Sequence, residues 1–234
     1  MSKVAAIILA AGKGSRMKSD RPKQFMELEG KPVLYYSLNV FSSCPQIEKI
    51  VLVTGENDIE FCKKDVVEKY NIPKVCDIVA GGEERYWSVL NGLEVVKNYD
   101  YVLIHDAARP CVTLDMIEKS IDEVKKVSAC TVGVPVKDTI KIVDEDGMGI
   151  DTPKRDTLWQ IQTPQSFSVK LLMAAYDRMR EQKATDITDD TMIVERFAGV
   201  KSKVLYGDYC NIKVTTPEDF EVIKIFLEKN KKSC

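Results

Sequence analysis

Histidine is almost absent from this 234-residue chain, in which His105 is the only one. A catalytic relay of the Ser-His-Asp or Cys-His type would therefore have to be built around that single residue. The seven cysteines include no C-x-x-C pair and leave an odd one over, so a zinc site would have to rely on widely scattered thiols. Reduced thiols in the cytoplasm fit this cysteine pattern best.

Long apolar runs and a strong excess of one charge are also missing. No stretch approaches the roughly 18 to 20 continuous apolar residues that a membrane-spanning helix needs, and the apolar run at 4–11 is short and leads into a glycine loop. Thirty-four Lys and Arg face 36 Asp and Glu, which gives a net charge of −2. We therefore expect neither a membrane nor a nucleic-acid partner, although local lysines could bind small anions.

Strand-like and helix-like segments alternate along most of the chain. Apolar, often β-branched runs of strand length lie at 4–9, 47–54, 75–80, 101–105 and 129–136. Apolar residues at three- and four-residue spacing predict helices at 33–41, 58–70, 85–96, 114–127, 169–180 and 191–197. This alternation predicts an α/β fold with a mainly parallel, twisted sheet covered by helices on both faces. Ligands of such sheets bind at the carboxyl ends of the strands.

One segment interrupts this alternation. Residues 138–159 contain two glycines and mixed charges and show no helical periodicity, and the side chains at 139–143 alternate between polar and apolar. We interpret about 137–159 as a protruding β-hairpin, which is either a solvated loop or an arm that pairs with another subunit. The rest of 1–234 is expected to form a single domain, with short strands at 203–206 and 212–214.

A glycine-rich loop follows the first predicted strand, at 9–17, and reads Leu-Ala-Ala-Gly-Lys-Gly-Ser-Arg-Met. Gly12 and Gly14 allow a tight turn that presents several backbone N–H groups to one anion. The loop does not match a P-loop, and a dinucleotide-binding fingerprint would need a third glycine where Met17 stands. A plain turn after a strand is the alternative interpretation.

Three cations favour the anion site over the plain turn. Lys13 and Arg16 lie in the loop, and Lys23 follows within eleven positions of the first of them. These side chains would repel one another without a polyanion between them. A triphosphate would neutralise them.

Two more motifs follow predicted strands. Gly81 and Gly82 would let a flat ring approach the backbone, and Ser88 lies where the next helix could offer a hydroxyl to a base. Asp106 ends another strand, where a carboxylate could coordinate Mg²⁺ or accept hydrogen bonds from sugar hydroxyls. The alternatives are a loop glycine pair in the first case and an ion pair with Arg109 in the second.

A second, separate set of cations lies later in the chain. Lys154 and Arg155 stand on the return limb of the predicted hairpin, and Lys213 stands on a late predicted strand. Each alone is explained as a solvated cation. Together they predict a second anion-binding site.

In this order, the motifs resemble those of the 2-C-methyl-D-erythritol 4-phosphate cytidylyltransferases of the non-mevalonate isoprenoid pathway. The segments that carry the resemblance are 9–17, 22–24, 81–93, 105–110, 135–139, 163–167 and 211–219. The resemblance implies a Rossmann-like nucleotidyltransferase domain, a β-arm exchanged in a homodimer, and a cytoplasmic enzyme that uses Mg²⁺. Its reaction would be transfer of CMP from CTP to the phosphate of methylerythritol phosphate, with release of pyrophosphate.

The resemblance also implies roles for individual residues. Arg16 and Lys23 match the groups that stabilise the transition state, and Arg155 and Lys213 match the pair that positions the substrate phosphate. The nucleotide would be bound by Ala10, Ala11, Gly12, Gly14, Gly82, Ser88, Asp106 and Ala107. The substrate would be bound by Asp106, Arg109, Thr139, Arg155, Thr163 and Lys213. Mg²⁺ would be held mainly by the CTP phosphates, with Asp106 as its protein ligand. Thr139 and Arg155 would reach the neighbouring subunit's site.

Other functions share parts of this pattern. A ribitol 5-phosphate cytidylyltransferase shares the glycine loop and the 163–165 segment, but residues 136–139 and Ala108 resemble the methylerythritol branch. A sugar-1-phosphate nucleotidyltransferase for another base is disfavoured by Gly82 and Ser88. A noncatalytic nucleotide-binding regulator would be expected to have lost the cations. An NAD-dependent oxidoreductase shares only the fold class.

Overall fold

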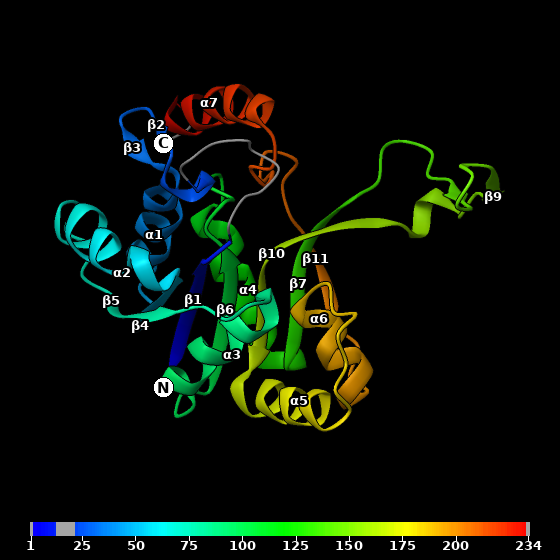
Figure 1. Ribbon diagram of the computed structural model, residues 1–234, viewed down its shortest axis with the longest axis horizontal. Helices are drawn as coiled ribbons and strands as arrows, with labels where there is room; N and C mark the ends of the chain where they lie inside the picture. Colours follow the sequence, from blue (N-terminus) through cyan, green and yellow to red (C-terminus); the bar gives the residue numbers. More distant parts are fainter. Residues whose placement is uncertain (1, 13–21, 233–234) are drawn as a thin grey trace.

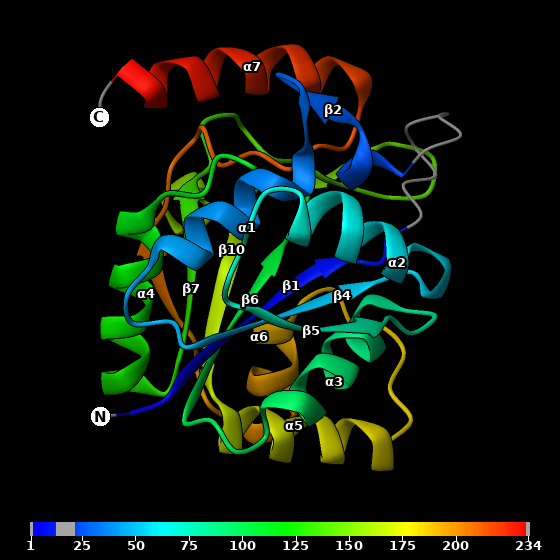
Figure 2. The same ribbon diagram turned by 90° about the vertical axis from the view of Figure 1, so that its left-hand side faces the viewer.

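Within the residues that the computed structural model describes, 2–12 and 22–232, seven strands form one sheet (Figures 1 and 2). The strand order is β11-β7-β10-β6-β1-β4-β5. Six strands run in one direction, namely β1 (Val4–Ala10), β4 (Lys49–Thr54), β5 (Val75–Ala80), β6 (Tyr101–Asp106), β7 (Ala129–Pro135) and β11 (Lys203–Tyr206). The remaining strand, β10 (Trp159–Ser168), lies antiparallel between β6 and β7. The mainly parallel α/β sheet is confirmed.

The two faces of the sheet carry separate apolar cores, because successive side chains of a strand point in opposite directions. On β1, Ala6 and Ile8 face one core, whereas Ala5 and Ile7 face the other. The first core is covered by α1 (Val33–Ser43), α2 (Ile59–Phe61) with the π-helical turns η4 (Cys62–Glu68), and α4 (Leu114–Val127). The second is covered by α3 (Arg85–Val96), α5 (Val169–Glu181), and α6 (Asp190–Ile193) with η6 (Val194–Ala198). The predicted helices therefore lie on both faces, as expected.

A third, smaller apolar cluster lies under the last helix, α7 (Pro217–Lys232). Figure 2 shows α7 lying across one end of the molecule, beside the short hairpin of β2 (Glu27–Leu28) and β3 (Lys31–Pro32). Phe220 and Ile223 of α7 pack with Leu28, Ala108 and Val214. This cluster fixes the segment before α7 against the loop that follows β6.

One strand was missed by the sequence pattern, and one predicted strand is wrong. Strand β10 was not expected, because its Gln162, Thr163 and Gln165 interrupt any apolar run, yet these side chains are buried and hydrogen-bonded. The expected strand at 212–214 does not form. Val214 N donates to Ala108 O at 2.8 Å and Val214 O accepts from Lys23 Nζ at 2.6 Å, which fixes the segment without a strand ladder.

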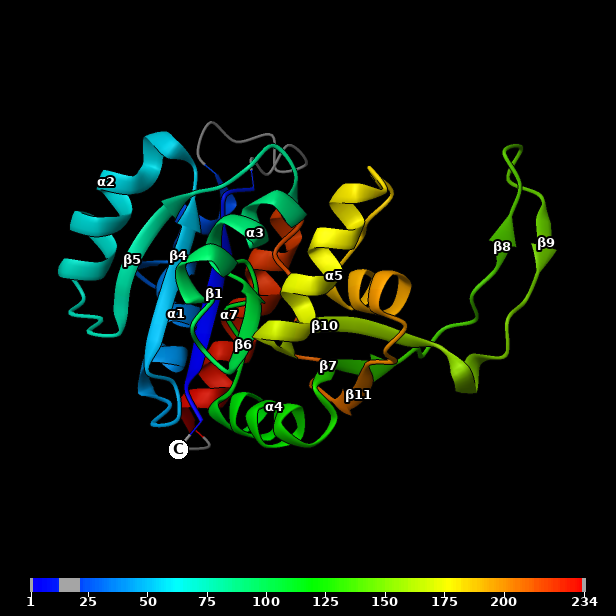
Figure 3. The same cartoon turned by 90° about the horizontal axis from the view of Figure 1, so that it is seen from below.

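The segment at about 137–159 extends away from the sheet (Figures 1 and 3). Within it, β8 (Ile142–Val143) pairs with β9 (Gly149–Asp151), and the 3₁₀ turn η5 (Arg155–Thr157) follows on the return limb. Nearly all of its side chains are exposed. At its base, Tyr209 donates a hydrogen bond to Pro135 O at 2.9 Å, and Lys137 Nζ lies 3.6 Å from the centre of the Tyr209 ring.

The described part of the chain also shows the state of the cysteines and the apolar length of the helices. Its cysteines at 44, 62, 76, 111 and 130 are free thiols. Cys111 is buried in the cluster under α7, and burial raises the pKa of its thiol to about 12. None of the helices in residues 2–12 and 22–232 is both long enough and apolar enough to cross a bilayer.

Gly92 of α3 is predicted to resist substitution, because the helix presses directly on the sheet there. A Cβ atom at this position would lie 2.8 Å from Ile7 Cγ2 and 3.2 Å from Val53 Cγ2. Alanine favours a helix over glycine by about 1 kcal/mol, but overpacking costs about 1–3 kcal/mol. The balance of the two is a loss of about 1 kcal/mol, and of about 2 kcal/mol at most, in the free energy of unfolding of Gly92→Ala measured by urea titration. Glu94→Ala, on the exposed face, is the control, and equal stability of both variants would contradict the packing argument.

Candidate active site

A pocket of about 640 Å³ lies at the carboxyl ends of β1, β5 and β6, where sheets of this kind bind ligands. The loops after these strands form its wall, and the segment before α7 completes it with Lys213 and Thr215. The predicted site residues that line it are Ala10, Ala11, Gly12, Lys23, Gly82, Ser88, Asp106 and Lys213. Residues from five separate stretches of sequence thus meet at one edge of the sheet.

The segment after β1 is held in place by Gln24. Its Nε2 donates to Ala10 O at 2.5 Å and to Gly12 O at 3.0 Å. Because the side-chain amide of Gln24 donates hydrogen bonds to both carbonyls, the backbone from Ala10 to Gly12 is fixed at the pocket wall. Gln24 is buried, and sequence analysis assigned it no role. Gly14 and Arg16, both predicted site residues, lie outside the described residues.

The glycine pair after β5 brings bare backbone to the pocket. A Cβ atom on Gly81 would overlap the Cβ of Ala11, and one on Gly82 would overlap the Cβ of Trp87. Gly82 N donates to Ser88 Oγ at 3.0 Å, and Ser88 Oγ donates to Glu84 O at 3.3 Å. The hydroxyl of Ser88 therefore fixes the turn, and this part of the wall has no room for larger side chains.

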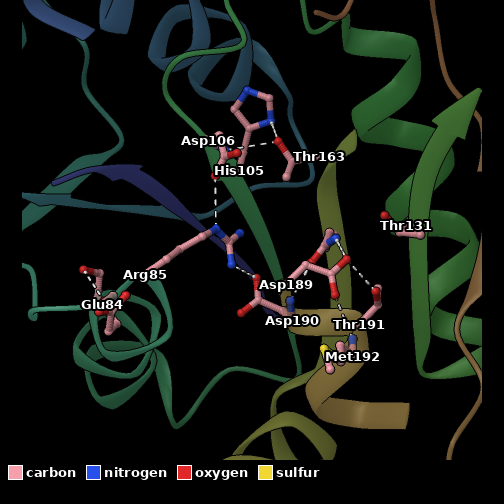
Figure 4. A network of polar contacts seen from close by, with 12 residues as sticks. Glu84, Arg85, His105, Asp106, Thr131, Thr163, Asp189, Asp190, Thr191 and Met192 are labelled. Atoms are coloured by element: carbon pink, nitrogen blue, oxygen red, sulfur yellow. Dashed lines mark hydrogen bonds and ion pairs between the residues drawn. The ribbon is translucent and has the colours of Figure 1, made fainter. Parts of the chain in front are cut away.

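Asp106, the last residue of β6, is a carboxylate that forms ion pairs with the cations around it, among them Arg85 (Figure 4). Lys213 Nζ lies 2.7 Å from its Oδ2, and Arg85 Nε lies 3.3 Å from its Oδ1. Burial alone would raise the pKa of this carboxyl, but Arg85, Lys213 and Arg109 outweigh it and hold the pKa well below its usual range. Asp106 is therefore an anion that two cations flank directly.

Lys23 and Lys213 approach the pocket from opposite ends of the chain. Lys23 begins a 3₁₀ turn after the glycine loop, and its Nζ donates to Val214 O at 2.6 Å. Lys213 directly precedes Val214 in the sequence, and the side chains of Lys23 and Lys213 both line the pocket. One member of each predicted cation set thus lines the same cavity.

Thr163, His105 and Arg109 stand behind the pocket wall. Thr163 Oγ1 accepts from Asp106 N at 3.1 Å and lies 2.9 Å from His105 Nδ1. His105 Nε2 lies 3.2 Å from Arg109 O, and Arg109 Nη1 donates to Asn211 O at 2.8 Å. His105 is fully buried, and burial lowers its pKa to about 4 despite the nearby Asp106. It is a neutral structural residue at neutral pH.

Besides Arg109 and Thr163, three more predicted site residues do not line this pocket. Ala107 is fully buried behind the wall, where its N–H donates to Leu9 O at 2.9 Å. Thr139 and Arg155 lie on the exposed arm, where Arg155 Nη1 donates to Lys137 O at 3.3 Å. Within one chain, these two side chains do not join the others.

The pocket residue Arg85 forms an ion pair with the buried Asp190, and neither was among the predicted site residues. Arg85 Nη1 lies 2.7 Å from Asp190 Oδ2, and Asp190 is fully buried. The adjacent Asp189 caps α6 by accepting from Met192 N at 2.8 Å. Asp190 directly follows the capping Asp189 and has no capping role of its own, and this was the one feature of the sequence that could have indicated an ion pair there.

The mainly parallel sheet, with bare backbone and a cation-flanked carboxylate at the carboxyl ends of its strands, defines the class as a Rossmann-like α/β fold with a ligand pocket at that edge. The sequence profile of the 2-C-methyl-D-erythritol 4-phosphate cytidylyltransferase family matches residues 4–229. The chain belongs to that family.

Relatives of the same name support this assignment along nearly the whole chain. The 2-C-methyl-D-erythritol 4-phosphate cytidylyltransferase of Clostridium botulinum strain 657 is 50% identical over 231 residues, which are 98% of this chain and 99% of that protein. The one from Lachnospira eligens is 47% identical over 224 residues, 95% of this chain and 98% of that protein. The crystal structure of the 4-diphosphocytidyl-2C-methyl-D-erythritol synthase of Anaerococcus prevotii superposes with a TM-score of 0.83 at 35% identity, covering 97% and 99% of the two chains.

The burial of His105 predicts a pH dependence of stability. Its pKa is about 4 in the folded protein and about 6.5 in an unfolded chain, so between these values the unfolded chain binds the extra proton. The free energy of unfolding should therefore fall by up to about 3 kcal/mol as the pH falls from 6.5 to 4.

Urea unfolding at pH 7, 6 and 5 measures this loss. His105→Gln keeps a donor near Arg109 O but cannot titrate in this range, so its stability should depend less steeply on pH than that of the unchanged protein. Parallel curves for the two proteins would show that His105 is not the group responsible.

Proposed function

We propose that this protein transfers CMP from CTP to the phosphate of 2-C-methyl-D-erythritol 4-phosphate, giving 4-diphosphocytidyl-2-C-methyl-D-erythritol and pyrophosphate. The observation that carries the proposal is one pocket that joins Lys23, Asp106 and Lys213 in a chain of this family. Two polyanions must meet during the reaction. A cavity with lysines from both ends of the chain suits that requirement.

In this proposal, the nucleotide lies against the backbone part of the wall. The bare chain at Gly81 and Gly82 admits a flat base, and Ala10 to Gly12 supply the start of the phosphate loop. Gly14, Arg16 and Lys23 would carry the triphosphate. Ala107 would act from behind the wall by fixing the strand end beside Asp106.

The acceptor is expected to lie on the side of Lys213. Arg109, predicted to bind the acceptor, stands behind the wall and would act on this side through Asp106, whose pKa its charge helps to lower. Thr163 fixes the backbone of Asp106 and supports the same side. Thr139 and Arg155 would come from the arm of a second subunit, because their own arm extends away from the sheet (Figure 3) and neither residue lines the pocket.

The chemistry needs no general base. A phosphate monoester has a second pKa of about 6, so at neutral pH its oxygen is already ionised and can attack the α-phosphorus of CTP directly. The bond from that phosphorus to pyrophosphate breaks, and the charge that builds on the leaving group is stabilised by Lys23 and Arg16. Consistent with this, the buried His105 is engaged by Thr163 and Arg109 O and takes no part.

Mg²⁺ belongs to the proposal as an ion that the nucleotide carries. Among the described residues, no group of three or more His, Cys, Asp or Glu side chains could hold a metal ion. Asp106 is a carboxylate at the pocket wall, and one carboxylate with substrate phosphates is a usual environment for Mg²⁺. Bound there, the ion would neutralise charge on the phosphates.

A homodimer in the cytoplasm completes the proposal. The arm exposes large apolar side chains, including Ile142, Val143, Met148 and Ile150, each between 47% and 67% exposed. Exposed apolar patches of this kind mark interaction surfaces. The free thiols favour a reducing compartment, because disulfides persist mainly in oxidising ones.

Pyrophosphate release from CTP and Mg²⁺ tests the activity directly. We expect release with 2-C-methyl-D-erythritol 4-phosphate and little with ribitol 5-phosphate, because residues 136–139 and Ala108 resemble the methylerythritol branch. Release only with ribitol 5-phosphate would assign the protein to polyol phosphate activation. No release with either acceptor would favour a noncatalytic nucleotide-binding protein.

Mixing two variants tests the shared site. Lys23→Ala and Arg155→Ala should each fold normally and lose most turnover, since each removes a cation of the reaction site. In a heterodimer, one site regains both cations. Random pairing should therefore restore about one quarter of the unmixed wild-type activity, since half of the dimers are mixed and each has one intact site.

Refolding the two variants together and assaying the mixture measures this recovery, and each variant refolded alone is the control. Activity that stays at the level of the separate variants would mean that the arm serves its own subunit or none.

A further inference from the structure

Arg85 connects the pocket to a charge in the protein interior. It is the first residue of α3, and its guanidinium lies between two carboxylates (Figure 4). Nε lies 3.3 Å from Asp106 Oδ1, at the pocket wall, and Nη1 lies 2.7 Å from Asp190 Oδ2, in the interior. The planar fork of an arginine can serve two partners in this way, whereas a lysine ammonium is a single point of charge.

The inner carboxylate anchors the arginine. Asp190 is fully buried, and its Oδ1 accepts from Tyr176 Oη at 2.8 Å. Its backbone N–H donates to Gln165 Oε1 at 3.0 Å. Among the described residues, Arg85 is the only cation in an ion pair with Asp190. A buried charge that loses its partner destabilises a protein strongly, so Arg85 cannot leave Asp190 at small cost.

The outer carboxylate divides its charge between two cations. Asp106 has Arg85 at Oδ1 and Lys213 at Oδ2, and Lys213 is 36% exposed on its pocket side. A cation at one oxygen lowers the negative potential at the other. If Arg85 were withdrawn, Lys213 would have to neutralise Asp106 alone and would be held more firmly.

We propose that Arg85 is a positioning residue that sets how firmly Asp106 holds Lys213, and thereby how readily Lys213 turns to the phosphate of the acceptor. The inference rests on the proposed function, in which Lys213 binds that phosphate. Arg85 acts through Asp106 and does not itself touch the acceptor. The effect of changing it should therefore fall on the KM for the acceptor and spare the KM for CTP.

Arg85→Lys tests this role with the least disturbance of the interior. The ammonium should stay with the buried Asp190, so Asp106 loses its Oδ1 partner and draws Lys213 closer. We expect the KM for methylerythritol phosphate to rise by roughly three- to tenfold, the usual range for one charged hydrogen bond partly open to water. The KM for CTP should stay within about twofold, and kcat should change less than the acceptor KM.

A double-mutant cycle with Lys213→Met separates the proposal from a purely structural role. If Arg85 acts through Lys213, Arg85→Lys should have no further effect on the acceptor KM once Lys213 is gone. Arg178→Lys is the matched control, because Arg178 Nη1 donates to a backbone carbonyl, Phe197 O, and Arg178 does not line the pocket. Additive effects of the two changes would overturn the proposal, as would a rise in the KM for CTP.

Asp190→Asn provides a second, opposite test should Arg85→Lys fail to fold. Without the negative charge of Asp190, Arg85 interacts more strongly with Asp106, and this weakens the ion pair between Asp106 and Lys213. The KM for the acceptor should therefore stay the same or fall. A rise in this variant would overturn the proposal. An unchanged protein that releases no pyrophosphate with either acceptor would instead refute the proposed function, and the two failures are therefore distinct.

Discussion

The rest of the pocket depends on the ion pairs that the carboxylate of Asp106 forms with Lys213 and Arg85. A buried carboxylate is costly unless cations and hydrogen bonds surround it, and here they come from remote parts of the chain. Lys213 lies 107 residues away in sequence and Arg85 lies 21 away. The arrangement therefore exists only when α3, β6 and the segment before α7 have all reached their places.

The fold was largely predictable because its strands and helices bury continuous apolar faces. Strand β10 shows where this reasoning ends. It fills the space between β6 and β7 with Gln162, Thr163 and Gln165, whose polar groups are satisfied by partners such as Asp208 O, His105 and Asp189. A sequence pattern records the polarity of such a strand but not the distant partners that permit its burial.

The same limit applies to the site. Residues at the ends of predicted strands, such as Gly82 and Asp106, were identifiable because the ends of parallel strands meet at one edge of a sheet. Lys213 was identified as a cation on an expected late strand, although that strand does not form. Gln24 and Arg85 escaped notice, since each works through a carbonyl or carboxylate that only the folded chain brings near.

The glycine wall of the pocket has a consequence for inhibition. At Gly81 and Gly82 any side chain would overlap Ala11 or Trp87, so mutation can hardly reshape this surface without loosening the loops that build it. Backbone atoms offer the same hydrogen-bonding groups whichever residue the gene encodes. A compound that draws its affinity from this wall would leave a resistant strain few substitutions that weaken binding and still preserve the enzyme.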